Sequence, residues 1–263
     1  MNNSANQSGL TDFQIEVSKL FFSLPESDGF VVVGGAALIA NGVVDRRTDD
    51  LDFFTSKTDV RQAVNAFKDS SEKRNWRFWI DEDRNYPTFT RAHIAEPGMA
   101  DDDAVTIEFA QDAPPLQTTT FTVLGPTINV EDSAGQKMLA LFGRAAPRDF
   151  VDIHALSARY RKDELISLAA ERDLGFDTGV FGQMLDFLEH ITDEQLEVED
   201  QQVQDIRLFF GEWRRQLSDE DTRTSPELPR SARKPRPGAV TAGGLTPSTH
   251  AVSGPTYGHP NFG

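Results

Sequence analysis

The sequence contains no cysteine among its 263 residues. The chain therefore forms neither a disulfide nor a metal site built on thiolates. The longest apolar run, Phe30 to Ala40, is far shorter than the ~20 residues that a membrane-spanning helix requires. The first ten residues, MNNSANQSGL, lack both the basic and the apolar segment of a signal peptide. These features predict a cytoplasmic protein with no membrane partner.

Several catalytic signatures are also missing. The sequence has no HExxH and no zinc-ligand spacing, and its five histidines are scattered. It has no GxSxG and no GxxxxGKS. These absences argue against a zinc hydrolase, an α/β-hydrolase and a P-loop NTPase.

Positive charge is scarce. The formal net charge is −16. Residues 223–263 hold five basic residues against one acid, so the rest of the chain carries −20. A field of this sign repels nucleic acid at long range, and such a partner would need a local basic patch. The candidates for that patch are Arg46, Arg47, Arg144, Arg148, Arg159, Arg161 and Lys162.

The order of apolar patterns predicts an α+β fold. Helical spacing is present over 11–24, 36–41 and 58–73, with Thr11 as the predicted cap of the first helix and Thr58 as that of the last. Strand-like runs lie at 30–33, 50–54, 76–80, 88–94, 105–109 and 120–124. Trp76 and Phe78 are interpreted as core residues. Helices are then expected over 131–145, 148–160, 163–172, 179–190 and 201–217. This order predicts a small mixed sheet domain at 11–130 and a helical domain at 131–221, between a disordered start at 1–10 and a disordered tail at 222–263.

The segment VVVGGAALIANGVVDRRTDDLDFF, residues 31–54, sets two carboxylates beside an apolar strand. On a strand, Asp50 and Asp52 project from one face while Leu51 and Phe53 point to the other. Two acids so close repel each other unless a cation lies between them. Mg²⁺, or Mn²⁺ in its place, would suit such a pair, with water and phosphate oxygens as further ligands.

The flanking residues suggest a nucleotide site. Gly34 and Gly35 lie between a strand and a helix, where a backbone can approach phosphate. Thr48 and the pair Arg46–Arg47 lie on the approach to the aspartates and could contact a triphosphate. Glu108, between the apolar Ile107 and Phe109, is the candidate third carboxylate for a second metal ion, with Asp112 as the alternative. Each feature also has a simpler interpretation: a solvated strand edge, a tight turn or an outward glutamate.

Taken together, GGAALIANG…RRTDDLDFF resembles the AbiEii/AbiGii-type nucleotidyltransferases, a branch of the DNA polymerase beta-like superfamily that includes the MenT toxins. That family combines a glycine pair and a helix with an Arg-x-Ser/Thr-x-Asp-x-Asp strand. A helical lysine and an Arg-Asp-Phe-x-Asp segment follow. Here these are Lys137 in GQKMLALFGR and the run RDFVD at 148–152. The resemblance covers roughly residues 30–155, with Thr48 where serine is frequent.

The resemblance implies a role for each matching residue. Asp50 and Asp52 would bind the metal, while phosphate contacts would come from Gly34, Gly35, Arg47, Thr48, Lys137 and Arg148. Asp149, or otherwise Asp152, would orient the acceptor or take its proton. A plainer reading is that these acids, following Pro147, complement a helix dipole.

The implied reaction is transfer of a nucleoside monophosphate from an NTP to an acceptor hydroxyl. The family implies a toxin acting on tRNA 3′ ends, with a cognate antitoxin as partner, in toxin–antitoxin or phage-defence systems. Two alternatives stay open. The acidic charge would suit a small-molecule acceptor such as a polycationic aminoglycoside, and a module that only binds a partner is possible because fold alone does not define function.

Overall fold

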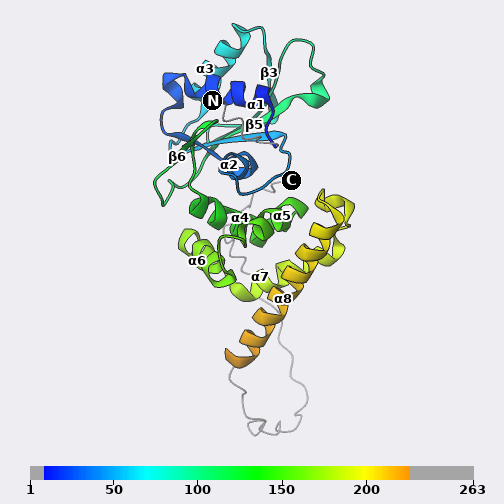
Figure 1. The fold of residues 1–263 in the computed structure, drawn as a ribbon. Coiled ribbons are helices and arrows are strands. Elements are labelled where there is room, and N and C mark those ends of the chain that lie inside the picture. Colours follow the sequence, from blue (N-terminus) through cyan, green and yellow to red (C-terminus); the bar gives the residue numbers. More distant parts are fainter. Residues whose placement is uncertain (1–8, 225–263) are drawn as a thin grey trace, which may run out of the picture. The chain divides into compact units, whose positions relative to one another are not determined.

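The computed structural model describes residues 9–224. Residues 1–8 and 225–263, which hold most of the predicted disordered start and tail, lie outside the described part. Within it, a seven-stranded mixed sheet comes first and helices follow, which confirms the predicted α+β class (Figure 1). No helix of residues 9–224 is both long and apolar enough to cross a membrane.

The strands are arranged in the order β3-β4-β5-β2-β1-β7-β6. They are β1 (Phe30–Val33), β2 (Asp50–Thr55), β3 (Arg77–Tyr86), β4 (Phe89–Ala95), β5 (Val105–Gln111), β6 (Thr120–Thr122) and β7 (Gly125–Thr127). The central strand β2 runs antiparallel to β1 and parallel to β5. β2 is therefore enclosed by neighbours, and what its side chains meet depends on the register on both sides.

The helices are α1 (Asp12–Phe22), α2 (Gly34–Ala40), α3 (Arg61–Glu72), α4 (Val130–Arg144), α5 (Pro147–Leu156), α6 (Lys162–Arg172), α7 (Thr178–Leu185) and α8 (Asp200–Thr224). Short 3-10 turns occur at Pro25–Ser27, Asp101–Asp103, Asp186–His190 and Glu194–Leu196. As predicted, Thr11 caps α1: its hydroxyl accepts from Gln14 N at 3.1 Å, and Gln14 Oε1 accepts from Thr11 N at 2.8 Å. This capping box satisfies two backbone donors at the helix start.

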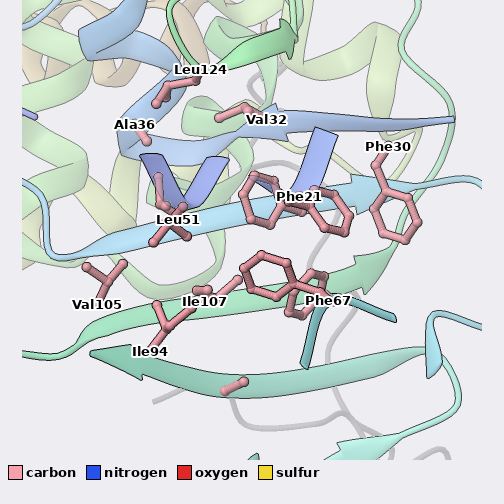
Figure 2. Close-up of a cluster of buried hydrophobic side chains, with 14 of the residues drawn as sticks. Phe21, Phe30, Val32, Ala36, Leu51, Phe67, Ile94, Val105, Ile107 and Leu124 are labelled. Carbon is pink, nitrogen blue, oxygen red and sulfur yellow. The ribbon is translucent and has the colours of Figure 1, made fainter. Parts of the chain in front are cut away.

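One hydrophobic cluster joins α1 and α3 to one face of the sheet. Phe21 of α1 and Phe67 of α3 are fully buried against Leu51, Phe53 and Phe109 of the strands. Figure 2 shows several of these side chains packed together. Side chains alternate along a strand, so the residues of β2 and β5 that lie between these core positions face the other side of the sheet. Asp50, Asp52 and Glu108 are among them.

A second cluster fills the helical part, around Phe150 of α5, Phe181 of α7 and Trp213 of α8, and includes Leu38 and Ile39 of α2. Helix α2 therefore contributes to both cores, since Ala36 and Ala37 belong to the first. This shared helix connects the glycine pair at its start to the sheet and to α4.

Some predicted boundaries were wrong. Helix α3 begins at Arg61 with Val60 as its N-cap, rather than after a cap at Thr58, and Asp59 Oδ1 accepts from Arg61 N at 2.9 Å just before it. The strand expected at 120–124 ends at Thr122; a turn at 123–124 follows and leads into β7, and Gly125 provides the positive φ of +104° that the turn uses. The helix expected at 179–190 ends at Leu185 and continues as a 3-10 turn.

Candidate active site

Three carboxylates gather in the middle of the sheet. Asp50 and Asp52 share one face of β2, and the parallel pairing with β5 sets Asp52 directly opposite Glu108. Leu51 and Phe53, on the other face, are fully buried. The alternative third acid, Asp112, instead contacts Gln136 Nε2 at 3.2 Å and Arg172 at 3.9 Å. The register therefore brings Glu108, and not Asp112, beside the aspartate pair.

Two of the three carboxylates are held by arginines. Arg148 Nη1 donates to Asp50 Oδ2 at 3.1 Å, and Arg91 Nε donates to Glu108 Oε1 at 2.9 Å. Burial first, and then the nearby charges of Glu108 and Asp50, together raise the pKa of Asp52 to about 7, against the opposing effect of Lys137 and Arg148. Concentrated negative charge at this point would be relieved by a cation.

The glycine pair makes room for three side chains of the site. Gly34 has φ +69°, and a Cβ there would lie 1.9 Å from Asp52 Oδ2. A Cβ at Gly35 would lie 2.8 Å from Arg46 Nη2 and 3.3 Å from Thr48 Oγ1. The glycines were predicted to let the backbone approach a phosphate; in the structure the groups that lie against them are the side chains of Asp52, Arg46 and Thr48.

A buried charge network connects the loop before β2 to α4 and α5. Arg46 donates to both oxygens of Asp152, through Nε at 2.8 Å and Nη2 at 2.9 Å, and Lys137 Nζ lies 2.7 Å from Asp152 Oδ2. Arg144 donates to both oxygens of Asp149, at 2.9 and 3.0 Å, and Lys137 Nζ lies 3.8 Å from Asp149 Oδ1. Burial alone would raise the pKa of Asp152, but Lys137 and Arg46 outweigh it and hold that pKa below its usual range.

The two aspartates of this network are fully buried, at 0% exposure, and Lys137 is 7% exposed. Lysine at this position is therefore part of the interior rather than a solvated surface group. Asp149 also accepts a 3.3 Å bond from the backbone N–H of Ala146, which stabilises the start of α5. Asp149 and Asp152 therefore hold the basic side chains of Arg46, Lys137 and Arg144 in place.

The structure places Arg46, rather than its neighbour Arg47, against residues of the candidate site. Arg47, which was predicted to contact the nucleotide, is exposed, and its carbonyl oxygen accepts from Arg46 Nη1 at 2.9 Å. Arg46 is the member of the pair that lies against Gly35 and Asp152. A signal was present, since Arg46, Thr48, Asp50 and Asp52 continue the same two-residue spacing.

The basic residues considered for an RNA patch are mostly paired within the chain. Of the seven, five form ion pairs with acids of the protein itself: Arg46, Arg144, Arg148, Arg161 and Lys162. Arg159 donates to the carbonyl oxygen of Gly42 at 2.9 Å. Lys162 also lies over the rings of Phe209, at 4.9 Å, and Trp213, at 6.0 Å. An RNA partner would therefore meet largely neutralised groups here.

The donor chemistry suits Mg²⁺, which prefers carboxylate oxygens and near-octahedral geometry. Within residues 9–224, however, no group of three or more acids and histidines already surrounds one point. The arginine pairs of Asp50 and Glu108 account for this, because each draws its carboxylate toward a guanidinium. The charge on these carboxylate oxygens fits a divalent cation, which would compete with the arginines for Asp50 and Glu108.

Two solved structures share the fold, and a third aligns less well. A Helicobacter pylori protein described as a candidate nucleotidyltransferase aligns with TM-score 0.53 at 16% identity, over 82% of this chain and 99% of that one. JHP933 from Helicobacter pylori aligns with TM-score 0.52 at 16% identity, over 82% and 96%. MenT4, a nucleotidyltransferase toxin from Mycobacterium tuberculosis, aligns with TM-score 0.39 at 14% identity, over 71% and 73%.

A sequence search of curated proteins finds no match. The sequence profile described as "Nucleotidyl transferase AbiEii toxin, Type IV TA system" matches residues 20–234, which is most of the chain. That range contains the glycine pair, the carboxylates and the charge network described above. The protein therefore belongs to the AbiEii family of nucleotidyltransferase toxins.

Proposed function

We propose that this nucleotidyltransferase uses Mg²⁺, or Mn²⁺, to transfer a nucleoside monophosphate from an NTP to the 3′-terminal hydroxyl of an RNA, with tRNA as the first candidate. The observation that carries the proposal is the register of β2 and β5, which sets Asp52 opposite Glu108 with Asp50 on the same face. The buried ammonium group of Lys137, from α4, is paired with Asp149 and Asp152 of α5.

The metal would be held by Asp50, Asp52 and Glu108. When bound, it supplies positive charge that stabilises the charge developing on the phosphates. Because Asp50 and Glu108 are paired with Arg148 and Arg91, those arginines would be released as the carboxylates turn to the cation. Arg148, with 51% of its side chain exposed, is then free to contact the triphosphate.

The protein's main contribution is positioning and charge neutralisation. Lys137 brings an ammonium group beside the site, and Asp149 and Asp152 hold it there. Thr48 and the backbone at Gly34 and Gly35 would line the phosphate side. The acceptor oxygen forms a bond to the α-phosphorus, the bond from that phosphorus to the bridging oxygen breaks, and pyrophosphate leaves. The acceptor's hydroxyl proton passes to solvent or to a site carboxylate.

A small-molecule acceptor such as an aminoglycoside is the second candidate. The net charge of −16 and the internal pairing of five of the seven candidate basic residues favour a cationic acceptor over RNA. The AbiEii profile favours a toxin instead, and with it a cognate antitoxin.

The test uses purified full-length protein with Mg²⁺, each α-³²P-labelled NTP in turn, and total tRNA. We expect label on tRNA with the wild type, and less than about 1% of it with Asp50→Asn or Asp52→Asn, because each removes a charge that the site needs. Chelation of the metal should abolish labelling. Label on kanamycin but not on tRNA would overturn the RNA proposal, and labelling that survives both substitutions would overturn the assigned site.

Expression in cells separates the same alternatives. Growth arrest that disappears with Asp50→Asn supports a toxin, whereas resistance to an aminoglycoside supports the second candidate. The two substitutions keep side-chain size, and circular dichroism at matched concentration should show that the fold is retained.

A further inference from the structure

The polar face of the sheet continues beyond the carboxylates. Asp50 of β2 pairs with Thr106 of β5, which pairs with His93 of β4, which pairs with Trp79 of β3. Residues in register across adjacent strands share a face. A row of side chains therefore leads from the aspartate pair to the edge strand β3.

The far end of this row is an ordered aromatic stack. The rings of Trp79 and His93 have centroids 5.3 Å apart and lie within 22° of parallel. His93 is held by two polar contacts: its Nε2 lies 3.1 Å from Asp81 Oδ1 and its Nδ1 lies 3.4 Å from Thr106 Oγ1. The Arg77 guanidinium lies 5.6 Å from the Trp79 ring centre. Both aromatic residues are half-buried, so parts of their rings remain accessible.

A small side chain separates the stack from the carboxylates. Between His93 and Asp50 the row contains only Thr106. Neighbouring strands lie about 4.8 Å apart, so the backbones of these two residues are separated by about 10 Å. The row thus places the aromatic pair at one end and the carboxylates at the other, with one threonine between them.

The direction of attack assigns this surface to the acceptor. In-line displacement puts the attacking oxygen and the leaving pyrophosphate on opposite sides of the phosphorus. The cations proposed to hold the pyrophosphate, Lys137 and Arg148, come from α4 and α5, and Gly34 and Gly35 follow β1. In the sheet order, β5, β4 and β3 lie on the other side of β2 from β1.

We propose that Trp79 and His93 form a stacking platform for the nucleobase of the acceptor's terminal nucleotide, above Thr106. The proposal rests on the nucleotidyl transfer proposed above and names where its acceptor binds. Base–aromatic stacking tolerates any base and needs no net positive charge. The two arginines at the platform are paired, Arg77 with Asp101 and Arg91 with Glu108, and Asp81 Oδ1 lies 3.1 Å from His93 Nε2.

This chemistry distinguishes the two acceptor classes. A single-stranded RNA end presents a planar ring to stack, and an acidic protein can bind it by this route despite long-range repulsion. An aminoglycoside has saturated rings and would be drawn to acids rather than to an aromatic wall. The platform therefore favours the RNA end, whereas the net charge favours a cationic acceptor.

The test measures KM separately for the NTP and for a short single-stranded RNA with a free 3′-hydroxyl. Trp79→Ala should raise the KM for RNA about 10-fold or more and leave the KM for NTP within a factor of two. Trp79→Phe keeps a ring and should restore most of the affinity. Phe121→Ala is the matched control, because Phe121 is 81% exposed on β6 at the opposite edge of the sheet.

If the substitutions raise the KM for NTP instead, the nucleotide's own base occupies the platform and the proposal is wrong. Equal kinetics in all variants would also refute it. Should the wild type transfer to no RNA, direct binding of the same RNA still decides: affinity lost in Trp79→Ala but kept in Phe121→Ala supports the platform, and no RNA binding by the wild type overturns it. Melting temperatures check that Trp79→Ala remains folded.

Discussion

Removing the charge of Asp152 should expose how much the buried network contributes to the fold. Asp152→Asn keeps the size of the side chain but leaves Arg46 and Lys137 without their shared carboxylate. The side chains of Arg46 and Lys137 are 15% and 9% exposed, so water compensates their charges poorly. Breaking a buried ion pair from one side typically costs about 3–5 kcal/mol. We expect a loss of that size in the free energy of unfolding at pH 7.

The matched control is Asp163→Asn. Asp163 pairs with Arg161 at 3.0 Å, but the two side chains are 71% and 73% exposed. Such a surface pair contributes less than about 1 kcal/mol. Urea unfolding followed by tryptophan fluorescence measures both variants, because Trp213 is buried in the helical core. A loss below about 1 kcal/mol in Asp152→Asn, matching the control, would refute the reasoning.

The effect should depend on pH with a definite sign. Since the pKa of Asp152 is lowered in the folded protein, its contribution is present above the unfolded pKa of about 3.9 and is lost as the pH falls through the folded value. The difference between wild type and Asp152→Asn should therefore be constant from about pH 5 to pH 7 and shrink below about pH 4. A difference that grows on acidification would contradict the assignment.

Two further predictions concern the site itself. Gly34→Ala should lower the rate of nucleotidyl transfer by about 100-fold, because the added Cβ displaces the Asp52 carboxylate. Gly42→Ala is the control in the same labelling assay: Gly42 has a similar φ of +65° but open space around it, so this variant tests the backbone strain alone. Arg148→Ala should change the free energy of unfolding by less than about 1 kcal/mol, since the pair with Asp50 is half exposed, yet raise the KM for NTP about 10-fold. An unchanged KM would remove Arg148 from the phosphate site.

The sequence was sufficient for features that depend on local spacing. The alternation DLDF predicted that Asp50 and Asp52 share a face, and the structure confirms it. The same logic identified Glu108 between two core residues. Whether Glu108 or Asp112 joins the pair depended on the register between β2 and β5, which a pattern within one strand does not contain.

Features formed between distant segments were not predictable in this way. The charges of the 137–152 region were expected to act on ligands, because a sequence shows charges but not the opposite charges that fold against them. Arg46 and Asp152 are 106 positions apart. The stack of Trp79 on His93 likewise depends on the pairing of β3 with β4. From the sequence, only Trp76 and Phe78 among these aromatic residues are singled out, and both are interpreted as core.

The charge network also sets an order of events during synthesis. Its members come from the loop before β2, from α4 and from α5, and each aspartate is buried only when its cations are present. A nascent chain that ends within α4 holds Lys137 but has neither Asp149 nor Asp152 to fix it. The site can therefore be completed only after α5 has emerged and packed, which delays the first turnover of a toxin until the whole sheet and helices α4 and α5 have been made.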